Sequence, residues 1–406
     1  MALSRTIAAE KFVEEFAIIP LTAECVFYSP KYLDKSVEKE LCDFLVILKR
    51  EAILVSMKSQ EDPATRAGDK LERWITKHAK KALRQAEGAL RTITGDSFYC
   101  HHSRRGRVDF TPGSLIVRHI VVLTEAIRRT VELPNDFPTS TNDIPVTYLS
   151  VNDFLNLTNE LRAFPDILSY LQARMILPHK NLITVGDEVP LYKYYILNEK
   201  SFAGYSGYED ARIVAAARGS NWQEYLTSKL LTDKFARIIE FVSDALATRL
   251  ESYPEGLRPE IVVQFDPTNN RRHYLLIQEE LCDLRLSERH ALGMQFTRVI
   301  DKVKKRNDIY GMAYDVFYTD SKDDFVYVLI SAKGIDRPIL IDRSSILLRA
   351  ALAAYKKKRG MVIADRDGKG FEVQMIMIPE CPDSPQDKKL GEHFFGHLRI
   401  SDFEIS

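Results

Sequence analysis

The chain has 406 residues, of which 45% are hydrophobic and 28% are charged, and its glycine and proline contents are close to average. This composition is typical of a folded globular protein of two or three domains, and it excludes a disordered or collagen-like chain. The 57 basic and 57 acidic residues cancel, so net charge indicates no partner. Apolar runs such as Phe44–Leu48 are far shorter than the roughly 20 residues that cross a bilayer, and the amino-terminal segment lacks the apolar core of a signal peptide. We therefore expect a cytoplasmic protein that makes no membrane contact.

Hydrophobic periodicity predicts the elements of the first third of the chain. In chain order these are a first helix (4–16), two strands of a tight antiparallel hairpin (43–48 and 52–57), a long amphipathic helix (69–93) and a strand buried on both faces (114–123). The long helix is the strongest signal, because its apolar residues follow the i, i+3, i+4, i+7 pattern. Helices and strands thus alternate in a way typical of an α/β protein.

A cluster of Pro, Asn and Asp residues over 134–145 predicts a linker, which divides the chain into domains 1–133 and 146–406. Beyond it we expect a helix capped by Ser150 or Asn152 and a surface turn at 186–188. The further predicted helices are 166–174, 221–250 and 284–305, and the further predicted strands are 260–265, 312–318, 325–331 and 371–378. The second domain is therefore expected to be another α/β region.

Three polar residues of the predicted hairpin form the pattern that points most clearly to chemistry. Asp43 opens the first strand, and Ser56 and Lys58 end the second, where a spacing of two residues keeps both side chains on one face. The antiparallel pairing can bring the carboxylate, the hydroxyl and the ammonium together. Such a set suits phosphodiester hydrolysis, in which oxygen ligands hold a divalent ion and a lysine stabilises developing negative charge.

The order of these elements resembles the PD-(D/E)XK nuclease superfamily, which includes restriction endonucleases, Mrr-like enzymes and Holliday-junction resolvases. The string Lys39–Ile47 followed by Ile53–Ser59 looks like the defence-type members, and the likeness covers roughly residues 4–125. It implies an amino-terminal restriction-endonuclease-like mixed sheet flanked by helices, and a metal-dependent enzyme that uses Mg²⁺ or Mn²⁺. The resemblance assigns the following roles: metal binding to Asp43, catalysis to Lys58, support of a metal-bound water to Glu10 or Glu14 of the first helix, and accessory polar contacts near the scissile phosphate to Lys81 and Gln85.

The chain departs from this family at one position. Two residues before the lysine, where Glu or Asp is usual, it has Ser56, a neutral and weaker ligand for a hard cation. Three outcomes stay open. Glu40, Glu14 or Glu61 supplies the missing charge, the site binds metal poorly, or catalysis has been lost.

The long helix and the loop after it are rich in basic residues. The segment from Arg66 to Arg107 contains eleven Lys and Arg residues but only four Asp and Glu residues. A phosphate backbone would be attracted to such a segment, although solvated helix faces are often charged as well. The expected nucleic-acid contacts are Lys77, Lys80, Lys81, Arg84, Arg104, Arg105 and Arg107.

The favoured interpretation is metal-dependent cleavage of DNA, in preference to RNA, in defence against foreign DNA. The rival interpretation keeps the nuclease fold as a weakened or inactive module that binds nucleic acid or a protein. The carboxy-terminal region is expected to recognise the target or a partner, or to support homo-oligomer formation.

Overall fold

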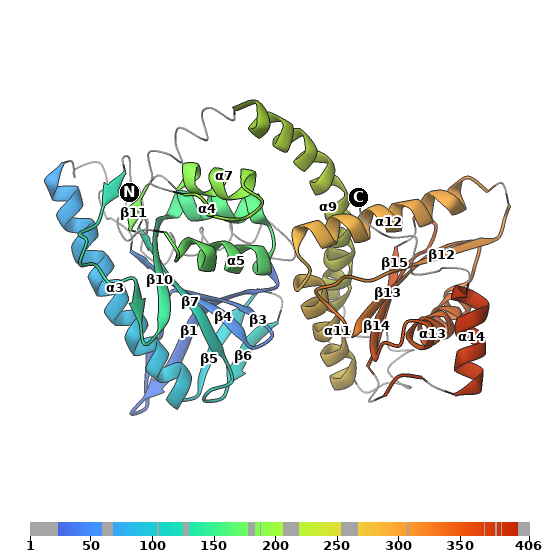
Figure 1. Cartoon of the computed structure of the whole chain (residues 1–406). Coiled ribbons are helices and arrows are strands. Elements are labelled where there is room, and N and C mark those ends of the chain that lie inside the picture. The colour runs from blue at the N-terminus through green and yellow to red at the C-terminus, as the bar shows by residue number, and fades with distance from the viewer. Residues whose placement is uncertain are drawn as a thin grey trace. The chain divides into compact units, whose positions relative to one another are not determined.

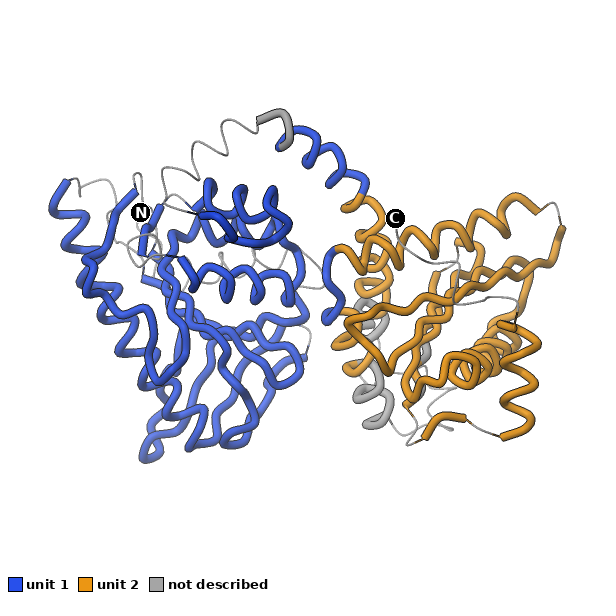
Figure 2. Tube along the Cα trace, viewed as in Figure 1, with its two compact units in different colours: residues 1–231, 282–286 blue, residues 232–281, 287–406 orange. Residues whose placement is uncertain are grey.

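A computed structural model describes most of the chain. The described residues are 23–58, 68–103, 105–124, 130–177, 183–186, 188–205, 219–252, 267–306, 308–368, 370–377, 380–382 and 384–396. They divide into two compact units, one of residues 1–231 with 282–286 and the other of residues 232–281 with 287–406 (Figure 2). The first predicted helix, with Glu10 and Glu14, and the predicted strand 260–265 lie outside the described residues.

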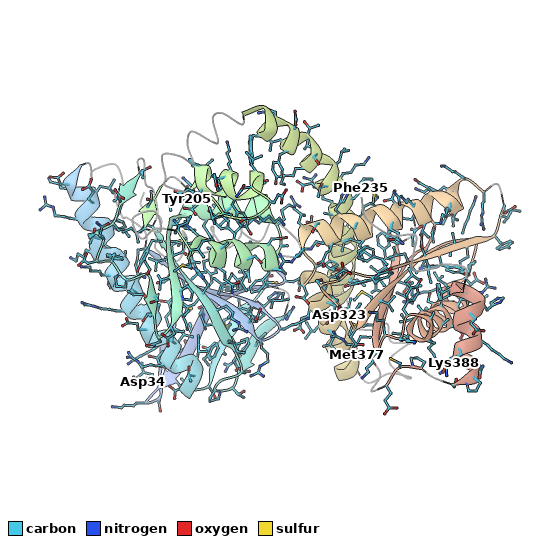
Figure 3. All side chains as sticks on the ribbon, viewed as in Figure 1. Asp34, Tyr205, Phe235, Asp323, Met377 and Lys388 are labelled. Atoms are coloured by element: carbon cyan, nitrogen blue, oxygen red, sulfur yellow. The ribbon has the colours of Figure 1, made fainter. Side chains whose placement is uncertain are left out.

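The first unit is built on a nine-stranded mixed sheet with the order β6-β5-β1-β3-β4-β7-β10-β9, in which β2 pairs with β1 (Figure 1). Its strands are β1 (Val26–Asp34), β2 (Val37–Glu40), β3 (Phe44–Leu48), β4 (Glu51–Lys58), β5 (Phe98–His102), β6 (Gly106–Phe110), β7 (Ile116–Thr124), β9 (Ser140–Thr141) and β10 (Ile144–Ser150). A separate two-stranded sheet joins β8 (Val131–Glu132) to β11 (Thr184–Val185). Asp34, labelled in Figure 3, closes β1 at the turn into β2 and pairs with Lys39 at 2.5 Å.

The predicted hairpin is confirmed at the centre of this sheet. Strands β3 and β4 are antiparallel, with Phe44 opposite Val55, and β4 continues parallel to β7. All five residues of β3 are buried, as are Ala52–Met57 of β4. Strands covered on both faces are apolar along most of their length, and this is why these runs, apart from Ser56, lack the alternation of a half-exposed strand.

Helix α3 (Asp69–Gly95) follows β4 in the connection to the parallel strand β7, a connection that also includes β5 and β6, and it packs against both β4 and β7. It corresponds to the predicted helix 69–93. Its buried face is formed by Leu71, Ile75, Ala79, Ala82, Leu83, Ala86, Ala89, Leu90, Thr92 and Ile93. The many alanines on this face let the helix approach the sheet closely, while its lysines and arginines remain on the outer side.

The segment 134–145 belongs to the first unit instead of separating two domains. Its turn residues Asn142 and Asp143 have positive φ angles of 49° and 63°, as a tight strand reversal requires, and they connect β9 to β10. Strand β10 then pairs in parallel with β7, with Val146 opposite Ile120, and its last five residues are buried. The turn chemistry was thus recognised from the sequence, but it marks a hairpin within a sheet, and the compact units divide near residue 231.

Three helices follow β10 and lie together in Figure 1: α4 (Val151–Leu161), α5 (Phe164–Arg174) and α7 (Val189–Leu197). Ser150 caps α4, since its hydroxyl accepts a hydrogen bond from the Asp153 N–H at 3.0 Å and the Asp153 carboxylate bonds back to Ser150. This confirms one of the two predicted caps. Helices α4 and α5 confirm the two predicted helices after the segment 134–145.

The second unit contains a four-stranded mixed sheet of order β12-β13-β14-β15, which confirms the expected carboxy-terminal α/β region. Its strands are β12 (Gly311–Phe317), β13 (Phe325–Lys333), β14 (Arg359–Asp365) and β15 (Phe371–Met377). The helices assigned wholly or partly to it are α9 (Gly219–Ser252), α11 (Pro267–Cys282), α12 (Leu286–Lys304), α13 (Arg337–Ala354) and α14 (Pro385–Phe395). Helix α13 joins the parallel strands β13 and β14 and contributes Leu340, Leu347 and Leu348 to the core.

Helices α9 and α12 meet at a glycine. A Cβ atom on Gly293 would lie 2.1 Å from the carbonyl oxygen of Phe235, labelled in Figure 3, so only glycine allows this contact.

Within the described ranges, no helix combines the length and the apolar character needed to span a membrane.

Candidate functional site

The end of the β3–β4 hairpin brings together the polar residues that the sequence singles out. Asp43 immediately precedes β3, and Lys58 is the last residue of β4. The Asp43 Oδ2 atom accepts a hydrogen bond of 2.6 Å from the Met57 N–H and lies 3.9 Å from the Lys58 Nζ atom. Both side chains keep limited solvent access, with exposed fractions of 18% for Asp43 and 16% for Lys58. The carboxylate and the ammonium therefore form a close pair at the rim of the sheet.

Ser56 lies beneath this pair. Its side chain is fully buried and forms a hydrogen bond with the Asp43 carboxylate, and its Oγ atom lies 3.5 Å from Lys58 Nζ. A hydroxyl enclosed in this way orients its two charged neighbours. Ser56 thus has the contacts of a positioning residue, in contrast to the direct metal contact expected from the motif.

Helix α3 contributes the remaining polar contact. The Lys58 ammonium donates hydrogen bonds to Gln85 Oε1 at 2.8 Å and to the Met57 carbonyl oxygen at 3.0 Å. Asp43 adds an opposite charge 3.9 Å from the same ammonium. Lys81, one helical turn before Gln85, is exposed and falls about 40° from it around the helix axis. The resemblance places Gln85 near the scissile phosphate, and the structure shows it in contact with Lys58.

The pKa values of two carboxyl groups at this end of the sheet, Asp43 and Glu40, are raised. Burial raises the pKa of Asp43 above its ordinary value, although Lys58 and the hydrogen bonds from Met57 and Ser56 counteract it. Desolvation likewise raises the pKa of Glu40, at the end of β2, and the negative charge of Asp43 adds to that shift. The negative charge of Asp43 therefore acts on Glu40, and a cation bound near Glu40 would offset that repulsion.

The carboxylates near Lys58 decide which residues could serve as metal ligands. No group of three or more His, Cys, Asp or Glu side chains in the described ranges is placed to enclose a metal. Mg²⁺, however, is commonly held by one or two carboxylates, with water and substrate phosphates completing its shell. Asp43 and Glu40 are the described carboxylates that could serve as such ligands here. Glu10 and Glu14 are outside the described residues, so their predicted part in the site is not described.

The basic residues expected to meet nucleic acid differ in their surroundings on α3. Lys77, Lys80, Lys81 and Arg84 are all exposed. Lys80 falls about 140° around the helix from Gln85, and its Nζ atom lies 5.7 Å from the centre of the Phe137 ring. Lys81 lies nearest to the Lys58 site by helical position. Exposed positive charges therefore extend around α3 from Lys81, on the side of Gln85, to Lys80.

The loop arginines are engaged within the protein. Arg105 is only 11% exposed and contacts the Glu24 carboxylate at 3.5 Å. The Arg107 guanidinium lies 3.8 Å from the centre of the Tyr99 ring, a cation–π contact. Arg104 is outside the described residues. Arg107 is 57% exposed but pairs with Asp109 at 2.9 Å, whereas Lys77, Lys80, Lys81 and Arg84 are exposed on α3.

Two polar features were missed in the sequence. Glu188, expected in a surface turn, is buried and binds the buried Arg174 through contacts of 2.6 and 2.9 Å. On α3, the Trp74 and His78 rings stack with their centres 4.4 Å apart and their planes at 25°. The four-residue spacing of this pair was the available signal, because it places both rings on one helix face.

Comparison of the chain with protein-family models, with curated proteins and with solved structures finds no match. The functional argument accordingly depends on the geometry around Asp43, Lys58 and Gln85.

Proposed function

We propose that the protein is a divalent-metal-dependent nuclease that hydrolyses DNA phosphodiester bonds at the Asp43–Lys58 site. The observation that carries this proposal is the position of the Lys58 ammonium, which lies 3.9 Å from the Asp43 carboxylate and 2.8 Å from Gln85. These residues come from two strands and a helix, in the order that resembles the PD-(D/E)XK superfamily. A lysine, a carboxylate and an amide brought together from separate parts of the chain are suited to bind a phosphate group that reacts.

Each residue then has a task that follows from its contacts. Asp43, with Glu40, would hold the metal ion, which when bound polarises a phosphate oxygen and lowers the pKa of a bound water. Lys58 would neutralise the negative charge that develops on the phosphate. Gln85 fixes the direction of the ammonium, and Ser56 fixes the carboxylate. Because these groups are oriented before substrate arrives, little reorganisation is needed during the reaction.

The exposed charges of α3 support a nucleic-acid substrate. Lys77, Lys81 and Arg84 are exposed on the helix that also carries Gln85. A polyanion bound along them would release counterions and gain affinity at low salt. The backbone would thereby be guided toward Lys58.

One observation favours a second candidate function, a non-catalytic module that binds nucleic acid. Ser56 replaces the usual acidic residue and is buried, and in the described ranges no cluster of three potential metal ligands forms. In that case Lys58 would contact a phosphate without cleaving the chain. The two candidates differ in whether metal-dependent product forms.

The test is a cleavage assay with purified full-length protein and with Lys58→Met, Asp43→Asn and Lys49→Met. Substrates are supercoiled plasmid, linear duplex, single-stranded DNA and RNA, each with Mg²⁺, Mn²⁺ or EDTA. Lys49 serves as the matched control because it lies in the turn at the other end of the same hairpin. We expect metal-dependent cleavage by wild type and Lys49→Met, and a loss of roughly 10²-fold or more in the two site variants.

If Lys49→Met loses as much cleavage activity as the two site variants, the cleavage cannot be assigned to the Asp43–Lys58 site. If wild type binds DNA but cleaves no substrate with either ion, the binding-module function replaces the nuclease.

A further inference from the structure

The sheet of the second unit repeats the strand arrangement that holds the candidate site. In the first unit β3 pairs antiparallel with β4, and β4 pairs parallel with β7. In the second unit β12 pairs antiparallel with β13, β13 pairs parallel with β14, and α13 packs on both parallel strands as α3 does on β4 and β7 (Figure 1). Strand β13 ends in Ser331 and Lys333 with the same spacing as Ser56 and Lys58 at the end of β4. Lys333 therefore has the topological position of Lys58.

The acidic residue of the candidate site has no counterpart at this position of the second sheet. The register of β12 and β13 places Ala313 opposite Ser331, whereas the register of β3 and β4 places Asp43 opposite Ser56. Ser331 instead donates a hydrogen bond of 3.0 Å to Asp365, which is buried on β14 at the other side of β13. The second edge thus keeps the lysine but has no carboxylate across from its serine on β12.

Lys333 is available to a ligand. Among the described residues no hydrogen bond or ion pair engages its ammonium group, and its side chain is partly exposed. Lys333 pairs with Gly311, the first residue of β12, so it lies at the edge where the segment after α12 enters the sheet. The Arg306 guanidinium is at the same edge, because it donates a hydrogen bond of 3.3 Å to the Met312 carbonyl oxygen. Two cationic groups therefore lie near the start of β12.

Two large apolar residues are held in solvent beside these cations. The exposed fractions of Ile309 and Tyr310 are 76% and 70%. Gly334, directly after Lys333, has a φ angle of 69°, and a Cβ atom there would lie 2.4 Å from the Ile309 carbonyl oxygen. This close approach, which glycine permits, fixes the backbone that carries both side chains. No aromatic ring of the described residues packs on Tyr310, so its ring is open to a ligand.

The charges around Tyr310 favour a polyanion. Over residues 304–310 and 333–336 the basic residues are Lys304, Lys305, Arg306 and Lys333, and the acidic residues are Asp308 and Asp336. An open aromatic ring among basic side chains is the combination that binds single-stranded nucleic acid, because the ring takes a base while the cations contact phosphates. The equivalence of Lys333 to Lys58 favours the same ligand, in preference to an anionic membrane surface.

We propose that the edge formed by Arg306, Tyr310 and Lys333 is a second nucleic-acid site, which binds a single strand without cleaving it. An unpaired base stacks on Tyr310, and Lys333 and Arg306 contact neighbouring phosphates. The faces of bases in an intact duplex are covered by their neighbours, so the site selects a single strand or an unpaired end. Ala313 takes the place of the metal-binding acid, and hydrolysis is therefore not expected here. The inference rests on the proposed function for its class of ligand, but it can be tested without cleavage.

The experiment measures binding by the full-length protein in EDTA, where no metal-dependent cleavage takes place. Fluorescein-labelled oligo(dT) and a hairpin duplex with the same number of phosphates are titrated by anisotropy at several salt concentrations. The variants are Tyr310→Ser, the conservative Tyr310→Phe, and Lys333→Met. Vesicles of phosphatidylserine and phosphatidylcholine are tested in parallel by cosedimentation.

The matched controls come from the opposite end of the same sheet. Met377, labelled in Figure 3, is 53% exposed and pairs with Arg359 at the start of β14, so Met377→Ser is the control for Tyr310→Ser. Lys358 is exposed directly before β14, and Lys358→Met is the control for Lys333→Met.

We expect Tyr310→Ser to weaken oligo(dT) binding roughly tenfold without changing the salt slope, and Tyr310→Phe to retain most of the affinity. Lys333→Met should lower the salt slope by about one phosphate contact. Duplex affinity should change little in Tyr310→Ser, and the two control variants should bind oligo(dT) as wild type does.

Unchanged oligo(dT) affinity in Tyr310→Ser, an equal loss for duplex, or the same loss in Met377→Ser would each overturn the second site. Loss of vesicle binding in Tyr310→Ser with oligo(dT) affinity intact would replace it with a membrane contact. Cleavage by a protein whose Tyr310→Ser variant binds normally would leave the nuclease proposal standing without this site. Tyr310-dependent binding by a protein that cleaves nothing would support the second site and contradict the nuclease.

Discussion

The Lys58 ammonium donates a hydrogen bond of 2.8 Å to the side-chain oxygen of Gln85, which ties the end of β4 to the crossover helix α3. The residues are 27 positions apart in the chain. A lysine on an exposed strand end would otherwise sample many rotamers, and this contact restricts it beside Asp43. The geometry of the candidate site therefore depends on how α3 packs on the sheet.

Gln85→Met should reduce the turnover of a nuclease about tenfold with little change in KM. The hydrogen bond to a charged donor contributes about 1.5 kcal/mol or more, and losing it lets the ammonium leave the reacting position. Gln85→Glu retains the acceptor and should recover most of the turnover. Single-turnover kinetics check this, with Arg91→Met, exposed farther along α3, as the control. An unchanged turnover in Gln85→Met would exclude a positioning role.

Asp43→Asn should stabilise the folded protein at neutral pH. Burial raises the pKa of Asp43 above 3.8, so ionisation disfavours the folded state. The wild-type carboxyl group contributes its full stability below pH 3.8 and loses it as the pH rises through the raised pKa. The difference in unfolding free energy between Asp43→Asn and wild type should therefore be small in acid and grow toward neutral pH. Urea unfolding at several pH values measures it, and the exposed Asp136→Asn should show no such growth.

His119 should make the unfolding free energy fall as the solution becomes acidic. Burial, and then the charge of Arg174, lower the pKa of His119 from 6.5 to about 3. Between these values the unfolded chain binds a proton that the folded chain rejects, so stability is lost as the pH falls below 6.5, by up to about 1.4 kcal/mol per pH unit. His119→Gln can keep the contact with Thr147, seen at 2.8 Å, and should remove this component. His101→Gln, on β5, is the control, and parallel pH profiles for His119→Gln and wild type would contradict the prediction.

Arg174→Met should destabilise the protein by about 3–5 kcal/mol in denaturant unfolding, because it leaves the buried Glu188 carboxylate without its opposite charge. Glu188→Gln keeps an acceptor for the Tyr170 hydroxyl, which bonds Glu188 at 2.5 Å. The double variant should therefore be more stable than Arg174→Met alone. If the loss of unfolding free energy in the double variant equals the sum of the losses in the two single variants, Arg174 and Glu188 are not energetically coupled.

Local patterns in the sequence determined the secondary structure around the candidate site. The apolar runs of β3 and β4 and the periodicity of α3 were predicted nearly to their ends, because each pattern reflects burial on a defined face. The meeting of Asp43 with Lys58 was predictable as well, because the short turn between the two strands fixes the register of the hairpin. The family resemblance assigned Gln85 to the surroundings of the scissile phosphate, but its contact with Lys58 is seen only in the structure.

Contacts between distant segments decided the rest. The turn at Asn142–Asp143 has the same composition in a linker as in a hairpin, and only the pairing of β10 with β7 distinguishes the two. From the sequence alone, Glu188 is expected to be a surface acid and Arg105 to be exposed. In the structure Glu188 is paired with Arg174, and Arg105 is paired with Glu24. A charged side chain changes its environment according to a partner far away in the sequence, and such pairings carry no local periodicity. Composition and spacing could therefore identify the residues of this protein's candidate site, whereas their burial and partners required the tertiary structure.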